Sequence, residues 1–283
     1  MTVLAIDQGT SATKALVVSE EGRILSEAEI PVHPRATPDG GVEQDPEELW
    51  ASILEAGGRA LAEAGAPVHA LALANQGETV LAWDPRSGRP LSAAISWQDG
   101  RAVDVCRRLA EHAEELRATT GLPLDPYFSA PKIVWLREHR TGEGVVTTTD
   151  AWLLHRLTGR AVTDAATASR TLLLDLDRVE WSARACELFG VDPETLPDIV
   201  PCAGPVGETR AFGDPPIPVA GLAVDQQAAL FAEACLDPGE AKCTYGTGAF
   251  LLATLGTTPR RSRARLVSCV AWQLDPTTYC LDG

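Results

Sequence analysis

The first part of the chain alternates apolar segments with short polar turns. Segments 3–6 and 15–18 are continuously apolar, and segment 23–31 mixes apolar and polar positions, so each favours a β-strand. Only the turns Gln8 to Ser11 and Glu21-Gly22 separate these segments. Because strands joined by such short turns pair with their neighbours in the chain, the pattern predicts an antiparallel β-meander.

A helical pattern follows the meander. Apolar residues recur at helical spacing, at Leu49, Ile53 and Leu61. Asp45 fits the N-cap and Pro46 the first helical position, and Glu48 stands where a capping box has its acidic residue. Gly65 fits the residue that ends a helix in the left-handed conformation. These signals predict one helix that begins after Asp45 and ends before Gly65.

The remainder of the chain alternates predicted strands and helices. Strands are predicted over 70–74, 91–97, 171–176 and 218–223. Helices are predicted from Asp99 to about Ala118, from Asp150 through Leu157, and over 182–189 and 226–234. Segment 240–255 favours a second β-hairpin, and 265–274 and 277–281 favour strands. This order predicts an α/β domain with a mixed sheet, followed by the beginning of another domain.

Charge and hydropathy exclude two classes of partner. The 283 residues carry 24 Lys and Arg against 39 Asp and Glu, so the formal net charge is −15. Nucleic-acid affinity depends mostly on the neutralisation of phosphates, so we expect no nucleic-acid partner. No segment approaches the roughly 18 consecutive apolar residues that span a membrane, so we expect no membrane partner.

Cysteine and histidine usage indicates the compartment. The seven cysteines include no CxxC pair, which is typical of reduced thiols. The five histidines form no HExxH motif, which argues against a zinc site. The N-terminal segment lacks a basic region and its apolar run ends at Asp7, so it does not resemble a signal peptide. We therefore expect a cytoplasmic protein.

Two Gly/Thr-rich turns are candidates for phosphate binding. The chain contains neither a P-loop nor a Rossmann fingerprint. It does contain Asp7 to Ser11 and Tyr245 to Gly248, whose glycines would let the backbone approach an anion closely. An Asp at a strand end can also hold Mg²⁺ through water. Each turn alone is more typical of a plain hairpin, but the two together suggest a phosphate clamp between two lobes.

Asp7 to Lys14 resembles the first phosphate hairpin of the FGGY carbohydrate kinases, and Tyr127 to His139 matches that family's first signature pattern at every constrained position. Within the family, the chain most resembles the glycerol kinases. Further similar segments are 41–46, 120–128, 163–171, 224–231 and 244–250. The resemblance implies an α/β fold of the actin/hexokinase-like (ribonuclease H-like) class, with a mixed-sheet domain and a truncated second domain of the same superfamily.

The resemblance also implies roles for individual residues, with ATP and Mg²⁺ as cofactors and a small polyol or sugar as substrate. Asp225 would be the general base, and Asp7 would hold Mg²⁺ through water. The residues implied in phosphate binding are Gly9, Thr10, Ser11, Lys14, Gly246 and Thr247. Those implied in substrate binding are Glu78, Trp97, Tyr127, Asp225, Gln226 and Phe250.

Each role has a simpler structural alternative. Asp225 follows an apolar strand and opens a helix, where a carboxylate can take a proton from a substrate hydroxyl. The same position suits a plain N-cap, and one Asp can do both. The aromatic residues are also typical of core packing, and Lys14 of an exposed strand.

Two positions depart from the glycerol kinase pattern. Glycerol kinases have Arg immediately before the Glu that corresponds to Glu78, whereas this chain has Gly77. They also have a basic residue where this chain has Gly100. A missing charge-assisted hydrogen bond costs about 1.5–3 kcal/mol, or roughly 10–100-fold in affinity. The departures predict either a different, bulkier polyol or ketose, or a weakened glycerol site.

The length suggests how the chain is divided. Against this family, 1–231 corresponds to the N-terminal, substrate-binding domain and 232–283 to an incomplete start of the C-terminal, ATP-binding domain. We therefore expect a truncated polyol kinase, and a homo-oligomer is a further expectation for the full-length form. The alternatives are a substrate-binding half without kinase activity and an actin-like or chaperone-like ATPase, and the polyol-pocket residues argue against the ATPase.

Overall fold

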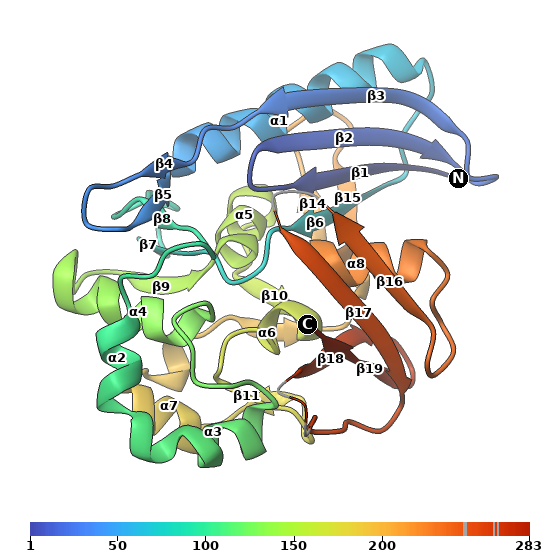
Figure 1. Cartoon of the computed structure of the whole chain (residues 1–283). Coiled ribbons are helices and arrows are strands. Elements are labelled where there is room, and N and C mark those ends of the chain that lie inside the picture. Colours follow the sequence, from blue (N-terminus) through green and yellow to red (C-terminus); the bar gives the residue numbers. More distant parts are fainter. Residues whose placement is uncertain (246–247, 263, 265) are drawn as a thin grey trace.

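A six-stranded mixed sheet organises the computed structural model, which describes residues 1–245, 248–262, 264 and 266–283 (Figure 1). Its strand order is β14-β15-β6-β1-β2-β3. The strands are β1 (Thr2–Gln8), β2 (Ala12–Ser19), β3 (Ile24–Pro31), β6 (Ala70–Asn75), β14 (Ala203–Thr209) and β15 (Ile217–Val224). The predicted antiparallel meander β1-β2-β3 is confirmed, whereas β6 and β15 join it in parallel with β1.

The parallel strands end together at one edge of the sheet. Gln8 at the end of β1 lies opposite Asn75 at the end of β6, which in turn lies opposite Val224 at the end of β15. The segments that follow these strands therefore emerge side by side. This edge is the usual position of a ligand site in sheets with parallel strands.

Helix α1 (Pro46–Ala64) packs on β2 and β3 as its apolar stripe predicts. Asp45 is the N-cap and accepts a hydrogen bond from the Glu47 N–H at 2.9 Å, and Gly65 ends the helix with φ 62°. The reciprocal capping-box bond is absent from the described hydrogen bonds, because the Glu48 carboxylate binds His33 instead. Leu49 and Ile53 are fully buried against the sheet.

A five-stranded sheet lies at the left of the molecule in Figure 1, with several helices below it. The strands are β4 (Arg35–Ala36), β5 (Val42–Gln44), β7 (Val80–Trp83), β8 (Ala94–Ile95) and β9 (Val145–Thr148). The helices are α2 (Val103–Arg108), η1 (Ala110–His112), α3 (Ala113–Thr120), α4 (Ser129–His139), α5 (Thr149–Thr158), α6 (Ala165–Ala168), α7 (Ala183–Phe189) and η2 (Pro193–Thr195). Two small ribbons pair β10 (Val162–Asp164) with β13 (Asp198–Val200) and β11 (Leu174–Asp175) with β12 (Glu180–Trp181).

The last part of the chain forms a third sheet. Helix α8 (Asp225–Ala232) leads into β16 (Ala241–Tyr245), β17 (Ala249–Gly256), β18 (Val267–Gln273) and β19 (Thr277–Asp282). The sheet order is β16-β17-β19-β18, with antiparallel pairing throughout. The predicted hairpin over 240–255 and the two strands that follow it are confirmed.

Several predicted elements were wrong in extent. The helix expected from Asp99 to about Ala118 begins only at Val103 and is divided into α2, η1 and α3. Asp99 does not cap it, because its carboxylate binds Arg101 and the Val42 N–H. The strands expected over 91–97 and 171–176 contract to β8 and β11. Asp150 does not cap α5, since it lies inside that helix and accepts a hydrogen bond from the Thr163 hydroxyl.

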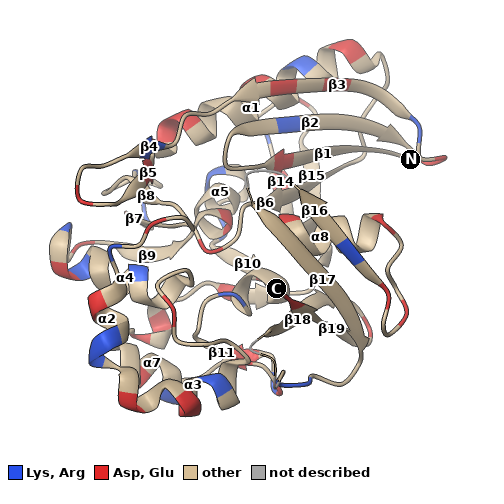
Figure 2. Cartoon of the chain, viewed as in Figure 1, with Lys and Arg blue, Asp and Glu red and all other residues tan. Residues whose placement is uncertain are grey.

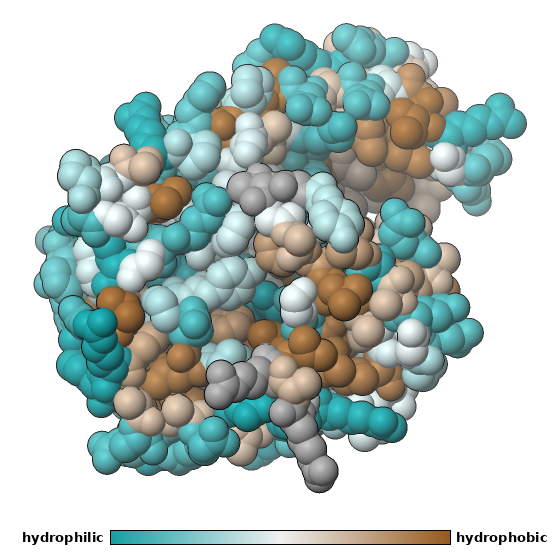
Figure 3. Space-filling model, viewed as in Figure 1, coloured by the Kyte–Doolittle hydropathy of each residue, from teal (hydrophilic) through white to brown (hydrophobic). Residues whose placement is uncertain are grey.

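The surface agrees with the composition. Along the described part of the ribbon, Lys and Arg alternate with Asp and Glu (Figure 2). Apolar side chains reach the surface over the third sheet, where half of the Leu251 side chain is exposed (Figure 3). None of the helices in the described residues is both long enough and apolar enough to cross a membrane.

Candidate functional site

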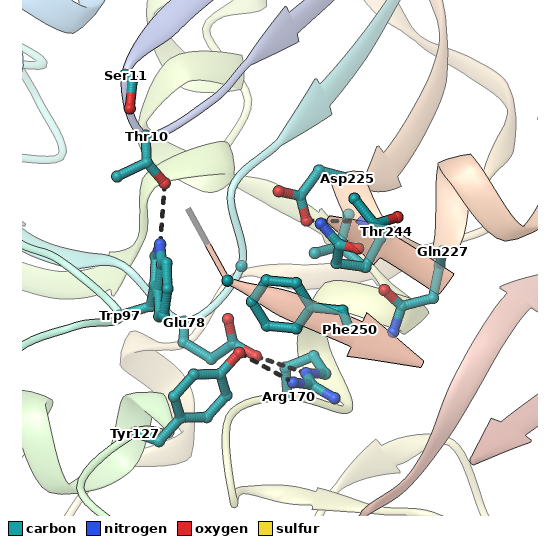
Figure 4. A pocket seen from close by; sticks show the side chains of 14 residues that line it. Thr10, Ser11, Glu78, Trp97, Tyr127, Arg170, Asp225, Gln227, Thr244 and Phe250 are labelled. Carbon is teal, nitrogen blue, oxygen red and sulfur yellow. Dashed lines mark hydrogen bonds and ion pairs between the residues drawn. The ribbon is translucent and has the colours of Figure 1, made fainter. Parts of the chain in front are cut away.

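A cavity of about 240 Å³ opens where the three parallel strands end. The β1–β2 turn, the loop after β6, the start of α8 and the β16–β17 hairpin all contribute to its wall (Figure 4). Its lining residues are Thr10, Ser11, Gly77, Glu78, Trp97, Tyr127, Arg170, Val224, Asp225, Gln226, Gln227, Thr244, Gly248 and Phe250. Segments far apart in the sequence thus meet around one small space.

The cavity brings together most of the residues that the sequence singled out. All six candidates for substrate binding line it: Glu78, Trp97, Tyr127, Asp225, Gln226 and Phe250. Of the phosphate-binding candidates, Thr10 and Ser11 line it, whereas Gly9 and Lys14 do not. Asp7, the candidate for the metal, also lies outside the cavity lining. Gly246 and Thr247 fall outside the described residues.

Asp225 is the first residue of α8 and lies directly after β15. Its Oδ1 accepts a hydrogen bond from the Gln226 N–H at 2.7 Å, and Val224, not Asp225, is the N-cap. Burial, together with the charges of the Asp7 and Glu78 carboxylates, raises the pKa of Asp225 to about 7. A carboxyl with this pKa near neutral pH is suited to accept a proton and release it again.

Three aromatic side chains form one wall of the cavity. The Trp97 ring meets Tyr127 and Phe250 edge to face, with ring centroids 5.9 and 5.8 Å apart. The Trp97 Nε1–H donates to the Thr10 hydroxyl at 2.9 Å, which ties this wall to the β1–β2 turn. None of the three rings is fully buried, so each presents apolar surface to the cavity as well as to its neighbours.

Glu78 forms an ion pair at the base of this wall with a residue that the sequence analysis missed. The Arg170 Nε–H donates to Glu78 Oε1 at 2.5 Å. Burial raises the pKa of Glu78, although the charge of Arg170 opposes the rise. Arg170 lies in segment 163–171, which carries part of the family resemblance, but a single arginine after an Ala-rich helix has no pattern that indicates a binding site.

Gln226 reaches the opposite side of the cavity from the start of α8. Its Oε1 accepts a hydrogen bond from Lys242 Nζ at 2.7 Å, and the same ammonium group donates to the Thr244 hydroxyl at 2.6 Å. Since its oxygen is engaged in this way, the Gln226 side-chain NH₂ is the group available to a ligand.

Asp7 and Lys14 lie on the sheet face away from α1. They are directly opposite each other in the β1–β2 pairing and line a separate, mostly apolar groove. Lys14 Nζ is 3.4 and 3.3 Å from the carboxylates of Glu27 and Glu29 on β3. Loss of hydration raises the pKa of Asp7, whereas the charge of Lys14 lowers it. No cluster of three potential metal ligands occurs among the described side chains.

Comparison with known sequences identifies the family. The sequence profile of the "FGGY family of carbohydrate kinases, N-terminal domain" matches residues 2–232. The chain belongs to the FGGY family of carbohydrate kinases. Glycerol kinases from Cereibacter sphaeroides and Myxococcus xanthus are each 43% identical over 99% of this chain. The chain spans 60% of the first of these relatives and 61% of the second.

Solved structures agree with this membership. A crystal structure of Plasmodium falciparum glycerol kinase with ADP covers the whole chain with a TM-score of 0.93 at 31% identity, and the chain covers 60% of it. Xylulose kinase from Rhodospirillum rubrum has a TM-score of 0.92 at 23% identity and shows the shared fold. The expected actin/hexokinase-like, mixed-sheet fold is therefore confirmed for this FGGY chain.

Proposed function

We propose that the chain acts in the ATP-dependent phosphorylation of a terminal hydroxyl of glycerol or a related polyol or sugar. The observation that carries the proposal is the placement of Asp225 in a cavity with hydrogen-bonding groups and an aromatic wall. A polyol needs both, because its hydroxyls require partners while its carbon skeleton favours apolar contact. The similarity to glycerol kinases supports the same reaction.

Asp225 is the proposed general base. The substrate hydroxyl attacks the γ-phosphorus of ATP, the bond from that phosphorus to the β,γ-bridging oxygen breaks, and the hydroxyl proton passes to the Asp225 carboxylate. The pKa of about 7 supports this role, since the carboxyl is partly deprotonated at neutral pH and accepts a proton readily. Glu78 and Gln226 are the proposed partners of the other hydroxyls, and Trp97, Tyr127 and Phe250 the apolar wall.

ATP and Mg²⁺ are the proposed cofactors. Asp7 lies near the end of β1 and Asp225 directly after β15, and carboxylate oxygens and water are the ligands that Mg²⁺ prefers. We propose Asp7 as the group that holds Mg²⁺ through water. Gly9, Thr10, Ser11 and Lys14 are the proposed contacts of the β- and γ-phosphates, together with Gly246 and Thr247.

A second candidate function is polyol binding without phosphoryl transfer. The observation that favours it is that all six substrate-binding candidates line the cavity, whereas among the described phosphate-binding candidates only Thr10 and Ser11 do. We also propose that residues 1–231 form the substrate-binding domain and that residues 232–283 begin the ATP-binding domain. Under either function the same cavity binds the polyol.

One experiment separates the two functions. The chain is incubated with MgATP and glycerol, erythritol, xylitol or D-xylulose, and phosphate esters are detected by ³¹P NMR, while calorimetry measures binding of each polyol. Ester formation that falls by about 10²–10⁴-fold in Asp225→Asn, and not in the exposed control Asp275→Asn, supports the kinase. Binding without any ester supports the second candidate. If none of the polyols binds, both candidate functions are contradicted.

A further inference from the structure

Arg170 is held at a junction of three elements. It follows α6, whose single turn is capped by Asp164. On one side, the Ser169 hydroxyl accepts a hydrogen bond from the Val270 N–H of β18 at 3.0 Å. On the other side, the Thr171 carbonyl accepts from the Ala130 N–H of α4 at 2.8 Å. The backbone at Arg170 is therefore fixed with respect to both the third sheet and the signature helix α4.

The guanidinium group contacts four side chains, two of which line the cavity. Its Nε–H donates to Glu78 Oε1 and its Nη1–H to Asp282 Oδ2, both at 2.5 Å. Its Nη2–H lies 3.4 Å from the Tyr127 hydroxyl, and Nη1 is 3.8 Å from Cys269 Sγ. Arg170 is only 4% exposed, Glu78 4% and Asp282 5%. Arg170 thus connects β19 with two residues that line the cavity.

Glu78 has an unusual backbone that fits this arrangement. Its φ is 57°, a left-handed value that is uncommon outside glycine and is maintained only where the surrounding structure enforces it. Because Oε1 is bound to Arg170, the orientation of the carboxylate is set. Oε2 has no hydrogen-bond partner among the described residues, and the Glu78 side chain lines the cavity (Figure 4). Without the guanidinium, the carboxylate would rotate or take up a proton, since burial raises its pKa.

We propose that Arg170 is the positioning residue of this cavity, which orients the Glu78 carboxylate so that its free oxygen accepts a hydrogen bond from a substrate hydroxyl remote from Asp225. In Figure 4, Arg170 and Asp225 are well separated, with Phe250 between them. A substrate whose reacting hydroxyl lies at Asp225 therefore presents a different hydroxyl to Glu78. Arg170 in this way determines which polyols fit, and the proposal rests on the proposed polyol-binding function.

The competing explanation is an ion pair that only stabilises the fold. The two explanations differ in how the loss of affinity after substitution depends on the ligand. If Arg170 acts through Glu78, its substitution should matter only for ligands that carry the hydroxyl that Glu78 binds. If the pair is only structural, substitution should weaken every ligand by the same factor or none at all. Lysine is the informative replacement, because it keeps the charge but cannot bridge two carboxylates as a planar guanidinium does.

The test is a cycle of two proteins and two ligands. Calorimetry gives the affinities of wild type and Arg170→Lys for glycerol and for 1,3-propanediol, which lacks the central hydroxyl, and for xylitol and its deoxy analogues. We expect Arg170→Lys to bind the complete polyol at least about 10-fold more weakly, and to bind the analogue without the contacted hydroxyl about as well as wild type does. Arg156→Lys, which alters an ion pair with Glu47 outside the cavity, is the matched control.

Further variants keep the test decisive if Arg170→Lys folds poorly. Asp282→Asn leaves Arg170 and Glu78 in place but removes one anchor of the guanidinium, so we expect a smaller loss with the same dependence on the ligand. An equal effect on all ligands, or no effect on any, would overturn the role of Arg170 and leave polyol binding intact. If the wild-type protein binds none of the polyols, the proposed function is overturned, and this proposal with it.

Discussion

Replacement of Asp225 by asparagine should stabilise the protein above neutral pH. The pKa of Asp225 is about 7 in the folded chain, whereas an unfolded Asp has a pKa of about 3.9. The folded state thus holds the proton more tightly. This tighter binding of the proton contributes fully to the stability of the folded state below about pH 4, and the contribution is lost as the pH rises to 7. Asparagine is uncharged at every pH and keeps the oxygen that accepts from the Gln226 N–H.

The pKa difference sets the size of the effect. A difference of about 3 corresponds to about 4 kcal/mol, at 1.36 kcal/mol for each unit of pKa. This value is a ceiling, because the Asp225 side chain is partly exposed to the cavity and solvent there screens its charge. We therefore expect Asp225→Asn to gain about 1–3 kcal/mol in unfolding free energy relative to wild type between pH 5 and pH 8.5.

Urea unfolding at a series of pH values measures the gain. Wild type, Asp225→Asn and the control Asp275→Asn are compared at each pH, and groups common to all three proteins cancel in the difference. The difference between Asp225→Asn and wild type should grow with pH and level off above about pH 8. A difference that is constant over this range, or that grows equally in Asp275→Asn, would refute the argument that Asp225 is buried at a cost in its charged form.

Three further predictions concern the cavity and the first hairpin. Trp97→Phe removes the 2.9 Å hydrogen bond to Thr10, so we expect about 0.5–1.5 kcal/mol lower stability in urea unfolding and weaker polyol binding in calorimetry. Gly77→Ala places a Cβ 3.0 Å from Val224 Cγ2. We therefore expect the protein to lose more affinity for xylitol than for glycerol in calorimetry. Equal losses for the two ligands would show that space at this position does not select the ligand. Lys14→Gln should change the free energy of unfolding by less than about 1 kcal/mol, because the ion pairs of Lys14 are exposed. It should lower ester formation from ATP if Lys14 contacts phosphate. Unchanged ester formation would show that Lys14 does not contact phosphate.

The cavity lining contains all the residues that the family resemblance implied in substrate binding, and the sheet topology explains why three of its segments meet. Thr10, Glu78 and Asp225 come shortly after β1, β6 and β15, and parallel strands in register bring such segments to one edge. The residue pattern itself indicated Asp225 and the first turn, whereas Glu78 was implied only by the family resemblance. The helix expected from Asp99 rested on a cap signal alone and was wrong, since the Asp99 carboxylate accepts hydrogen bonds from the nearby Arg101 and from the distant Val42 N–H.

Two features of the site could not be read from local patterns. Arg170 reaches Glu78 across 92 residues and Asp282 across 112, and no periodicity connects such positions. Asp7 was grouped with Thr10 because both belong to one turn motif. In a strand, however, successive side chains point to opposite faces, so Asp7 lies opposite Lys14 on the sheet face away from α1, while Thr10 at the tip reaches the cavity.

The charged groups of the cavity indicate whether its ligand is acidic or neutral. The cavity lining has one arginine, Arg170, and its guanidinium is engaged with Glu78 and Asp282 rather than free to replace an arginine at position 77. Glu78 and Asp225 supply hydrogen-bond acceptors, and the Gln226 NH₂ supplies a donor. An acidic sugar would meet two carboxylates with no unpaired cation among the described lining residues, at a cost in desolvation and repulsion. Neutral hydroxyls donate to carboxylates without that cost, so these charges favour a neutral ligand under both explanations for Gly77, and the comparison of xylitol with glycerol in Gly77→Ala distinguishes the two.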